Sequence, residues 1–366
     1  MPERLSSRST GDRVVVVGGG VIGLACARRL RLAGARVILV DPDVLNRQAG
    51  WAAGGMLAPL AEATSPGPFL QMARRSLQRY PAFVASLERS TGIRLGLHLN
   101  GKLLTAYDDT RAQELRGRLA WLGPRGGAVE WIDGDGARLL EPALSPEVRG
   151  GLLLRGNGRV DNRALLRALR ADCRARGVEF VRDRVTAVET LHGRVTGVRL
   201  ASGGPPVPAT AAVVAAGAWS GEIQGLPRAV PVRPVQGQML ALASPDRPLV
   251  RVVTAGDRYL IPRESPRGPV IVVGATEEEV GFDVSLDAAA QASLQEAAIR
   301  LVPALRAVPV VERWAGLRPG TPDGTPILGP DPQLPDLCYA TGHHRNGILL
   351  APVTAHRVAG WWQDRG

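Results

Sequence analysis

The sequence of 366 residues contains few aromatic residues, few cysteines and almost no lysine. Aromatic residues make up 4% of the chain, so base-stacking platforms for nucleic acids are scarce. Cys26, Cys173 and Cys338 are too few and too far apart for a disulfide framework, and we expect them to be buried as small apolar side chains. The five histidines show no metal-ligand spacing, so the sequence predicts no metal site.

Long apolar runs are also missing, and none approaches the ~18 residues of a membrane-spanning helix. Residues 1–12 are polar and are predicted to form a flexible tail rather than a signal peptide. A cytoplasmic protein that makes no use of a membrane is the resulting expectation. The length, with 45% hydrophobic residues, fits one large domain or two closely packed ones.

The net charge of +11 comes almost entirely from arginine, because Lys102 is the only lysine. The arginines are spread over predicted helix surfaces and form no compact basic tract interleaved with aromatic residues. We interpret the excess as the composition of a GC-rich genome, so a nucleic acid is not an expected partner. The charge should still favour anionic substrates.

A run of four valines leads into Gly18, Gly20 and Gly23, which form the pattern G-x-G-x-x-G at a predicted strand–turn–helix. The first glycine permits the tight turn, the second lets a pyrophosphate approach the backbone, and the third allows close helix packing. A second predicted strand, Arg36–Val40, ends at Asp41, whose carboxylate would hold a ribose hydroxyl. Together these features predict a dinucleotide site.

Strands alternate with helices in the first, middle and last thirds, which predicts a parallel sheet, whereas extended segments between residues 232 and 311 predict an antiparallel one. The predicted fold class is α/β, or α+β overall, with a Rossmann-like dinucleotide-binding domain and an antiparallel-sheet substrate domain. The first domain would be discontinuous and comprise residues 13–60, 145–230 and 315–366, and the second would comprise residues 61–144 and 231–314.

Three further features have both a functional and a structural interpretation, and the residues alone leave both open. The turn at Gly342–Pro352 could aim helix N–H groups at an anion, or it could be an ordinary helix entry capped by Asn346. Arg318 stands in a loop of small residues and could bind a substrate carboxylate or form a structural salt bridge. Tyr259 could donate a hydrogen bond in a site or pack in the core.

Six segments together resemble the D-amino-acid oxidase family of flavoenzymes. The similarity covers nearly the whole chain after the tail, and W-A-G-L-R-P-G-T and G-H-x-R-N-G-I-L-L-A-P are its most specific motifs. The segments are the glycine fingerprint and residues 51–59, 213–220, 235–238, 314–324 and 342–352.

The resemblance implies non-covalently bound FAD, which would perform the chemistry without a catalytic side chain. It implies that Arg318 grips the substrate carboxylate with the help of Tyr259. The residues implied along FAD are Gly18, Gly20, Val21, Ile22, Gly23, Asp41, Pro42, Ala49, Gly50, Gly54, Gly55 and Met56, then Val185 at the adenine, and His343, His344, Arg345, Asn346, Gly347, Ile348 and Leu349 at the isoalloxazine ring.

The activity implied is that of the family branch that oxidises glycine, with sarcosine and small D-amino acids as further substrates. Hydride transfer to the flavin, followed by reoxidation by dioxygen, would give an imine or glyoxylate, ammonia and hydrogen peroxide. A role in thiamine thiazole biosynthesis and a homo-oligomer, a tetramer in relatives, are also implied. Two alternatives stay open: a D-amino-acid or sarcosine dehydrogenase that reduces a quinone, and a tRNA-associated flavoprotein.

The chain departs from the family pattern at several positions around the implied site. Asp41 stands where glutamate is common, and either carboxylate suits a ribose. Asp257, Arg258 and Glu277 replace other residues, and His344 replaces an aromatic residue. These departures bear on which amine fits the pocket.

Overall fold

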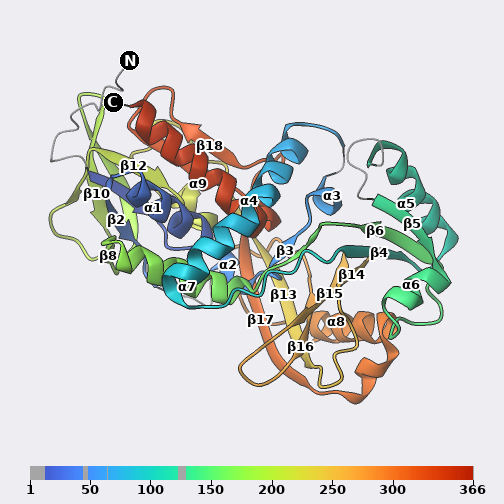
Figure 1. The fold of residues 1–366 in the computed structure, drawn as a ribbon. Helices are drawn as coiled ribbons and strands as arrows, with labels where there is room; N and C mark the ends of the chain where they lie inside the picture. The colour runs from blue at the N-terminus through green and yellow to red at the C-terminus, as the bar shows by residue number, and fades with distance from the viewer. Residues whose placement is uncertain (1–12, 44–47, 64, 123–128, 366) are drawn as a thin grey trace.

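The computed structural model describes residues 13–43, 48–63, 65–122 and 129–365, so the predicted tail lies outside the described residues. Two large sheets lie side by side (Figure 1). Helices α1, α7 and α9 gather beside one sheet, and α5, α6 and α8 lie beside the other. No helix within the described ranges is long and apolar enough to cross a membrane.

The first sheet has six strands and is parallel except at one edge. Its central strand carries Val14 and Val16 toward the helices, and Val15 and Val17 toward a small second sheet. All four valines are buried, as expected for a parallel strand covered on both faces. The strand order is β18 (Ile327–Pro330), β19 (Leu337–Thr341), β12 (Ala211–Val214), β1 (Arg13–Val17), β2 (Arg36–Val40) and β8 (Glu179–Val181).

Helices cover one face of this sheet and a three-stranded antiparallel sheet covers the other. The amphipathic α7 begins after Asp161, whose carboxylate accepts hydrogen bonds from two N–H groups of the first turn. The helices are α1 (Val21–Leu32), α4 (Pro68–Thr91), α7 (Asn162–Ala175) and α9 (Gly347–Asp364), and the small sheet consists of β9 (Val185–Leu191), β10 (Arg194–Leu200) and β11 (Val207–Pro208).

The second large sheet has eight strands and is antiparallel except for one pair, β14 with β4, which is parallel. The sequence predicts only antiparallel pairing here, and the difference arises because β4 comes from a distant part of the chain. The strand order is β17 (Val310–Gly320), β13 (Arg233–Ala243), β16 (Val270–Gly274), β15 (Arg258–Arg263), β14 (Val252–Ala255), β4 (Lys102–Ala106), β6 (Gly150–Leu154) and β5 (Val129–Asp133).

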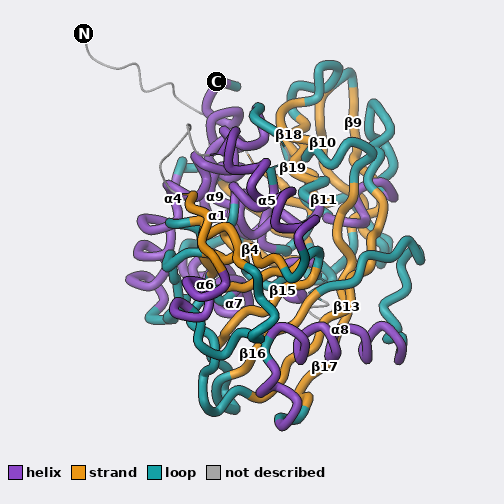
Figure 2. The backbone as a smooth tube through the Cα atoms, turned by 90° about the vertical axis from the view of Figure 1, so that its right-hand side faces the viewer, coloured by secondary structure: helices purple, strands orange, loops and turns teal. Residues whose placement is uncertain are grey.

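Figure 2 shows α8 lying along β13 and β16, where its apolar face closes the core of this sheet. The helices on this side are α5 (Asp109–Leu122), α6 (Gly134–Leu140) and α8 (Ala288–Leu301). Short elements complete the fold: α2 (Ala49–Ala52), β3 (Met56–Leu57), α3 (Pro59–Glu62), β7 (Gly158–Arg159), η3 (Gly217–Glu222), η4 (Pro303–Ala307) and η5 (His344–Asn346).

Two observations bear on the predicted domain boundaries. Strand β6 lies in the eight-stranded sheet, although residues 145–230 are predicted to belong to the dinucleotide-binding domain. Helix α4 packs against α7 and α9, although residues 61–144 are predicted to belong to the substrate domain. The division of the chain by residue range therefore stays a prediction.

Candidate functional site

A cavity of about 380 Å³ opens where β1 and β2 end, and it extends to the eight-stranded sheet. In open α/β sheets ligands bind at the carboxyl ends of the strands, as here. The cavity brings together nearly all the predicted site residues: Gly18, Gly20, Val21, Ile22, Asp41, Pro42, Ala49, Gly50, Gly54, Gly55, Met56, Val185, Tyr259, Arg318, His343, His344, Arg345, Asn346, Gly347 and Ile348.

Gly23 and Leu349 do not line this cavity. A Cβ at Gly23 would lie 1.8 Å from the carbonyl oxygen of Gly18, so this glycine lets α1 pack closely on the turn. The carbonyl of Leu349 accepts a hydrogen bond of 2.6 Å from Ser76 in α4, so this residue lies inside the helical layer.

Two glycines of the turn differ in their surroundings: Gly18 packs against protein backbone, whereas Gly20 faces open space. Gly18 has φ +104°, and a Cβ there would lie 2.4 Å from the carbonyl oxygen of Ala215. A Cβ at Gly20 would meet no atom of the described residues within 4 Å. Within the same residues no side chain caps α1, so its first N–H groups are available to an anion at the cavity. This arrangement fits a pyrophosphate.

The carboxylate of Asp41 is fixed by the backbone around it. It accepts hydrogen bonds from the N–H of Gly19 at 2.6 Å and from the N–H of Asp43 at 2.8 Å. A guanidinium nitrogen of Arg170 lies 4.0 Å away. Because Asp41 lines the cavity and is held in place, it can accept further hydrogen bonds from a ribose.

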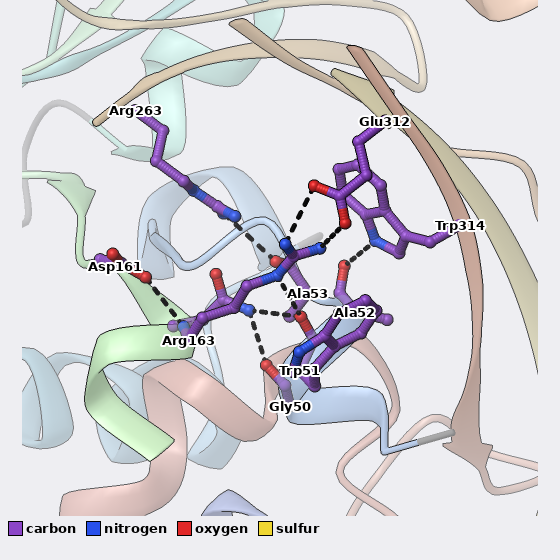
Figure 3. Close-up of polar contacts among 10 residues, drawn as sticks. Gly50, Trp51, Ala52, Ala53, Asp161, Arg163, Arg263, Glu312 and Trp314 are labelled. Atoms are coloured by element: carbon purple, nitrogen blue, oxygen red, sulfur yellow. Dashed lines mark hydrogen bonds and ion pairs between the residues drawn. The ribbon is translucent and has the colours of Figure 1, made fainter. Parts of the chain in front are cut away.

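The chain from Gly50 to Gly54 is held by side chains distant in sequence, and Figure 3 shows Gly50 to Ala53 with Arg263 and Trp314. Asn162 donates to the carbonyls of Gly50 and Trp51, at 2.7 and 2.9 Å, and Trp314 donates to that of Ala52 at 2.9 Å. Arg263 donates to the carbonyls of Ala53 and Gly54, and burial lowers its pKa to about 10. Five successive carbonyls are thus satisfied, and the wall of the cavity is rigid there.

Arg318 is held by backbone carbonyls and not by a carboxylate. Its two terminal nitrogens donate to the carbonyl of Gln236 at 3.2 Å and to that of Thr276 at 3.0 Å. Within the described part of the chain no ion pair with an acidic side chain is found for it. A Cβ at Gly237 would lie 2.4 Å from its guanidinium, so that glycine provides its space. Arg318 can therefore bind an external carboxylate.

Tyr259 lies between two glycines at the same end of the cavity. A Cβ at Gly274 would lie 2.6 Å from its hydroxyl oxygen, and a Cβ at Gly54 would lie 3.3 Å from its ring. The hydroxyl has one weak contact, with the sulfur of Met239 at 3.9 Å. Burial raises the pKa of this phenol, although the Arg318 charge opposes the shift. The hydroxyl is therefore a neutral donor for a ligand.

The entry to α9 differs from an ordinary capped helix. Asn346 occupies the N-cap position, but its side chain makes no capping hydrogen bond. The His343 ring is buried beside the hydroxyl of Thr354 at 3.0 Å, and burial lowers its pKa to about 3, so the ring is neutral. This turn therefore presents a neutral imidazole and the first N–H groups of α9 to the cavity, beside the charged side chain of Arg345.

The structure adds residues that the sequence analysis does not predict. Glu62 lines the cavity and pairs with Arg345 at 2.8 Å. Asn162 and Arg263 hold the wall without lining the cavity. Trp314 stands in one of the specific motifs, so its role in the site could have been predicted from the sequence. The roles of Glu62, Asn162 and Arg263 depend on contacts between distant segments.

A parallel sheet with a glycine turn opens into a cavity that ends at an arginine for which the described residues provide no carboxylate partner. This arrangement is typical of a dinucleotide-binding protein, with room beside the dinucleotide for a small anionic ligand. The family of FAD-dependent oxidoreductases matches residues 13–361, and the chain belongs to it. FAD is the cofactor of this family, and the glycine turn, Asp41 and the open entry to α9 fit it.

Curated relatives are similar over most of this chain. A glycine oxidase from Pseudomonas putida is 36% identical over 345 residues, which are 93% of this chain and 92% of that protein. A bifunctional protein ThiO/ThiG from Nostoc sp. is 40% identical over 352 residues, or 94% of this chain. The chain spans about half of that longer relative, 52% of its length.

Solved structures are similar as well. The glycine oxidase from Geobacillus kaustophilus has a TM-score of 0.90 at 30% identity and covers 96% of this chain and 95% of its own. An iminodiacetate oxidase from Chelativorans sp. has a TM-score of 0.86 at 28% identity. The predicted family and fold class are therefore confirmed.

Proposed function

We propose that this protein is an FAD-dependent glycine oxidase that deaminates glycine, and also sarcosine or small D-amino acids. The chemistry that FAD supplies when bound is the two-electron oxidation of the amine, with dioxygen as final acceptor and hydrogen peroxide as product. Hydrolysis of the imine gives glyoxylate and ammonia. The observation that carries this proposal is Arg318, a guanidinium at the end of the cavity that is oriented by two carbonyls and has no carboxylate partner among the described residues.

Arg318 binds the substrate carboxylate through two parallel hydrogen bonds, and the hydroxyl of Tyr259 donates a further one. Because both side chains are fixed, the bound amino acid has one orientation, and orientation supplies much of the rate in such reactions. No side chain is assigned as a general base, since the neutral amine is the reactive form.

The cofactor residues proposed from the family resemblance fall into groups along the cavity. The N–H groups at Gly20 and Val21 bind the pyrophosphate, Asp41 binds the ribose and Val185 lies at the adenine. Residues 343–349 lie at the isoalloxazine ring. The domain division proposed here assigns FAD to residues 13–60, 145–230 and 315–366, and the substrate to residues 61–144 and 231–314.

A place in thiamine thiazole biosynthesis is proposed from the relative named ThiO/ThiG, in which a chain similar to this one makes up about half of the protein. A cytoplasmic location, a homo-oligomer and the absence of a nucleic-acid partner stay predictions. Two competing functions remain: a dehydrogenase that reduces a quinone, and a tRNA-associated flavoprotein.

Anaerobic mixing of the holoenzyme with glycine tests the proposal. We expect glycine to bleach the visible flavin band. Arg318→Ala should raise the glycine concentration that gives half of the bleaching by about 30-fold or more, since a lost charge-paired contact costs about 2–5 kcal/mol. Arg313→Ala, an exposed arginine on the same strand, is the matched control and should behave as wild type.

Admitting air then identifies the electron acceptor. Rapid return of the band with stoichiometric peroxide supports an oxidase, whereas slow return in air and fast return with a quinone supports the dehydrogenase. Absence of bleaching by glycine, sarcosine and D-alanine would contradict the proposed function. Tight tRNA binding with a steep salt dependence would favour the third candidate.

A further inference from the structure

Glu277 follows the residue whose carbonyl orients the substrate-binding arginine. The Thr276 carbonyl accepts the Arg318 hydrogen bond at 3.0 Å, and the next side chain along the chain lines the same cavity. A carboxylate oxygen of Glu277 lies 3.4 Å from Nε2 of His344. Two positions at which the sequence departs from the family pattern are therefore in contact with each other.

The other charged groups at this end of the cavity neutralise one another. Arg345 pairs with Glu62 at 2.8 Å, and Arg258 pairs with Asp257 at 2.8 Å. Arg345, Glu62 and Asp257 line the cavity, whereas Arg258 does not and donates a further hydrogen bond to the carbonyl of Ala275. What remains is the positive charge of Arg318 and the group formed by Glu277 and His344.

That last group carries a net negative charge at neutral pH. Burial lowers the pKa of His344, and the positive charges of Arg318 and Arg345 lower it further, while Glu277 and Glu62 oppose the shift. The imidazole is thus uncharged at pH 7 and does not cancel the charge of Glu277. The Glu277 side chain is 54% exposed, so a ligand can reach it.

We propose that Glu277 determines specificity for substrates with a single carboxylate, an inference that rests on the proposed function. A ligand whose carboxylate binds Arg318 faces a wall with one negative charge. Glycine has a single carboxylate, so when that group binds Arg318 no further anionic group of the substrate faces Glu277. A second carboxylate on the ligand is repelled, and across a partly solvated cavity we expect about a tenfold loss of affinity.

Ligand binding tests this without turnover. Acetate, with one carboxylate, and malonate, with two, are titrated into the holoenzyme at neutral pH, and their dissociation constants are read from the change in the flavin spectrum. In wild type malonate should bind more weakly than acetate. Glu277→Gln should reduce the malonate dissociation constant, divided by that of acetate, about tenfold. The acetate dissociation constant itself should stay within about twofold of the wild-type value.

Glu279→Gln is the matched control, because it removes the same charge two residues away. Glu279 pairs with Arg233 at 2.6 Å and does not line the cavity, so the ratio should stay at the wild-type value. An unchanged ratio in Glu277→Gln would overturn the inference while leaving the carboxylate site intact. Equal acetate binding by wild type and Arg318→Ala would overturn both the inference and the proposed site.

Discussion

At the scale of single residues, the only lysine of the chain is one of its most buried charged side chains. Lys102 lies on β4 with 2% of its surface exposed, and its ammonium donates to the sulfur of Met56 at 3.4 Å. Burial lowers its pKa to about 8, and nearby arginines contribute, although Glu62 opposes the shift. An ammonium can release its proton when buried, whereas a guanidinium cannot, so lysine is the cation that this position tolerates.

Lys102→Met should stabilise the protein at neutral pH. The native pKa of about 8 lies below the unfolded value, so the native state is penalised wherever Lys102 is protonated. That penalty is fully present below pH 8 and disappears as the pH rises toward 10.5. We expect a gain of about 1–3 kcal/mol at pH 7 that falls as the pH rises from 8 through 10.5, measured by urea unfolding of both proteins. A gain independent of pH would contradict the assignment.

At the scale of elements, the turn between β1 and α1 contains two glycines for which we expect different roles. Gly18 is needed for the fold, and Gly20 is needed for FAD binding. Gly18→Ala should destabilise the protein without FAD by about 1–3 kcal/mol, because its φ is left-handed and Ala215 is in contact. Gly20→Ala should leave that stability within about 0.5 kcal/mol, since its Cβ would meet no atom in the described part of the chain. The same change should weaken FAD binding at least about tenfold.

Urea unfolding of the apoprotein and FAD titration by flavin fluorescence measure the two effects separately. Gly34→Ala is a useful reference, because it has φ +88° but lies far from the cavity, with nothing near its Cβ. It should lose stability and keep FAD affinity. Unchanged FAD binding in Gly20→Ala would show that the pyrophosphate lies elsewhere.

Elements with strong local patterns are predictable from the sequence, and the glycine turn is the best example. The strand, the turn and α1 follow from four valines and three spaced glycines. The alternation of strands and helices in the first part of the chain likewise predicts the parallel pairing of β1 with β2. Residues 94–99 belong to no named strand and form only an isolated bridge, between His98 and Arg159.

The support of the cavity is not predictable in the same way. Asn162, Arg263 and Trp314 meet the chain around Gly50 to Gly54 across more than 100 residues of sequence. No local sequence pattern predicts such a contact, because the packing of the two sheets determines which distant residues meet. The parallel pairing of β14 with β4 has the same origin. Arg318 was recognisable only because it stands alone in a specific motif.

At the scale of the whole molecule, the cavity is lined by both large sheets, so its ligand joins them. We expect FAD at about 100 times its dissociation constant to stabilise the protein by about 2.7 kcal/mol and to raise the melting temperature by several degrees. Riboflavin, which lacks the pyrophosphate and adenine, should have a smaller effect at the same concentration. An equal shift with both ligands, measured by scanning calorimetry, would contradict the extended binding mode.

The burial of the three cysteines has a consequence for the working lifetime of the protein. Cys26, Cys173 and Cys338 are fully buried, and burial raises the pKa of each thiol, to about 12 for the last two. The proposed function releases peroxide into the cavity, and because peroxide attacks thiolates, these buried and protonated thiols would be spared. The sulfurs most at risk belong to Met56 and Met239, which line the cavity. Oxidative ageing would therefore begin at the substrate end as methionine sulfoxide, a lesion that reductases can reverse.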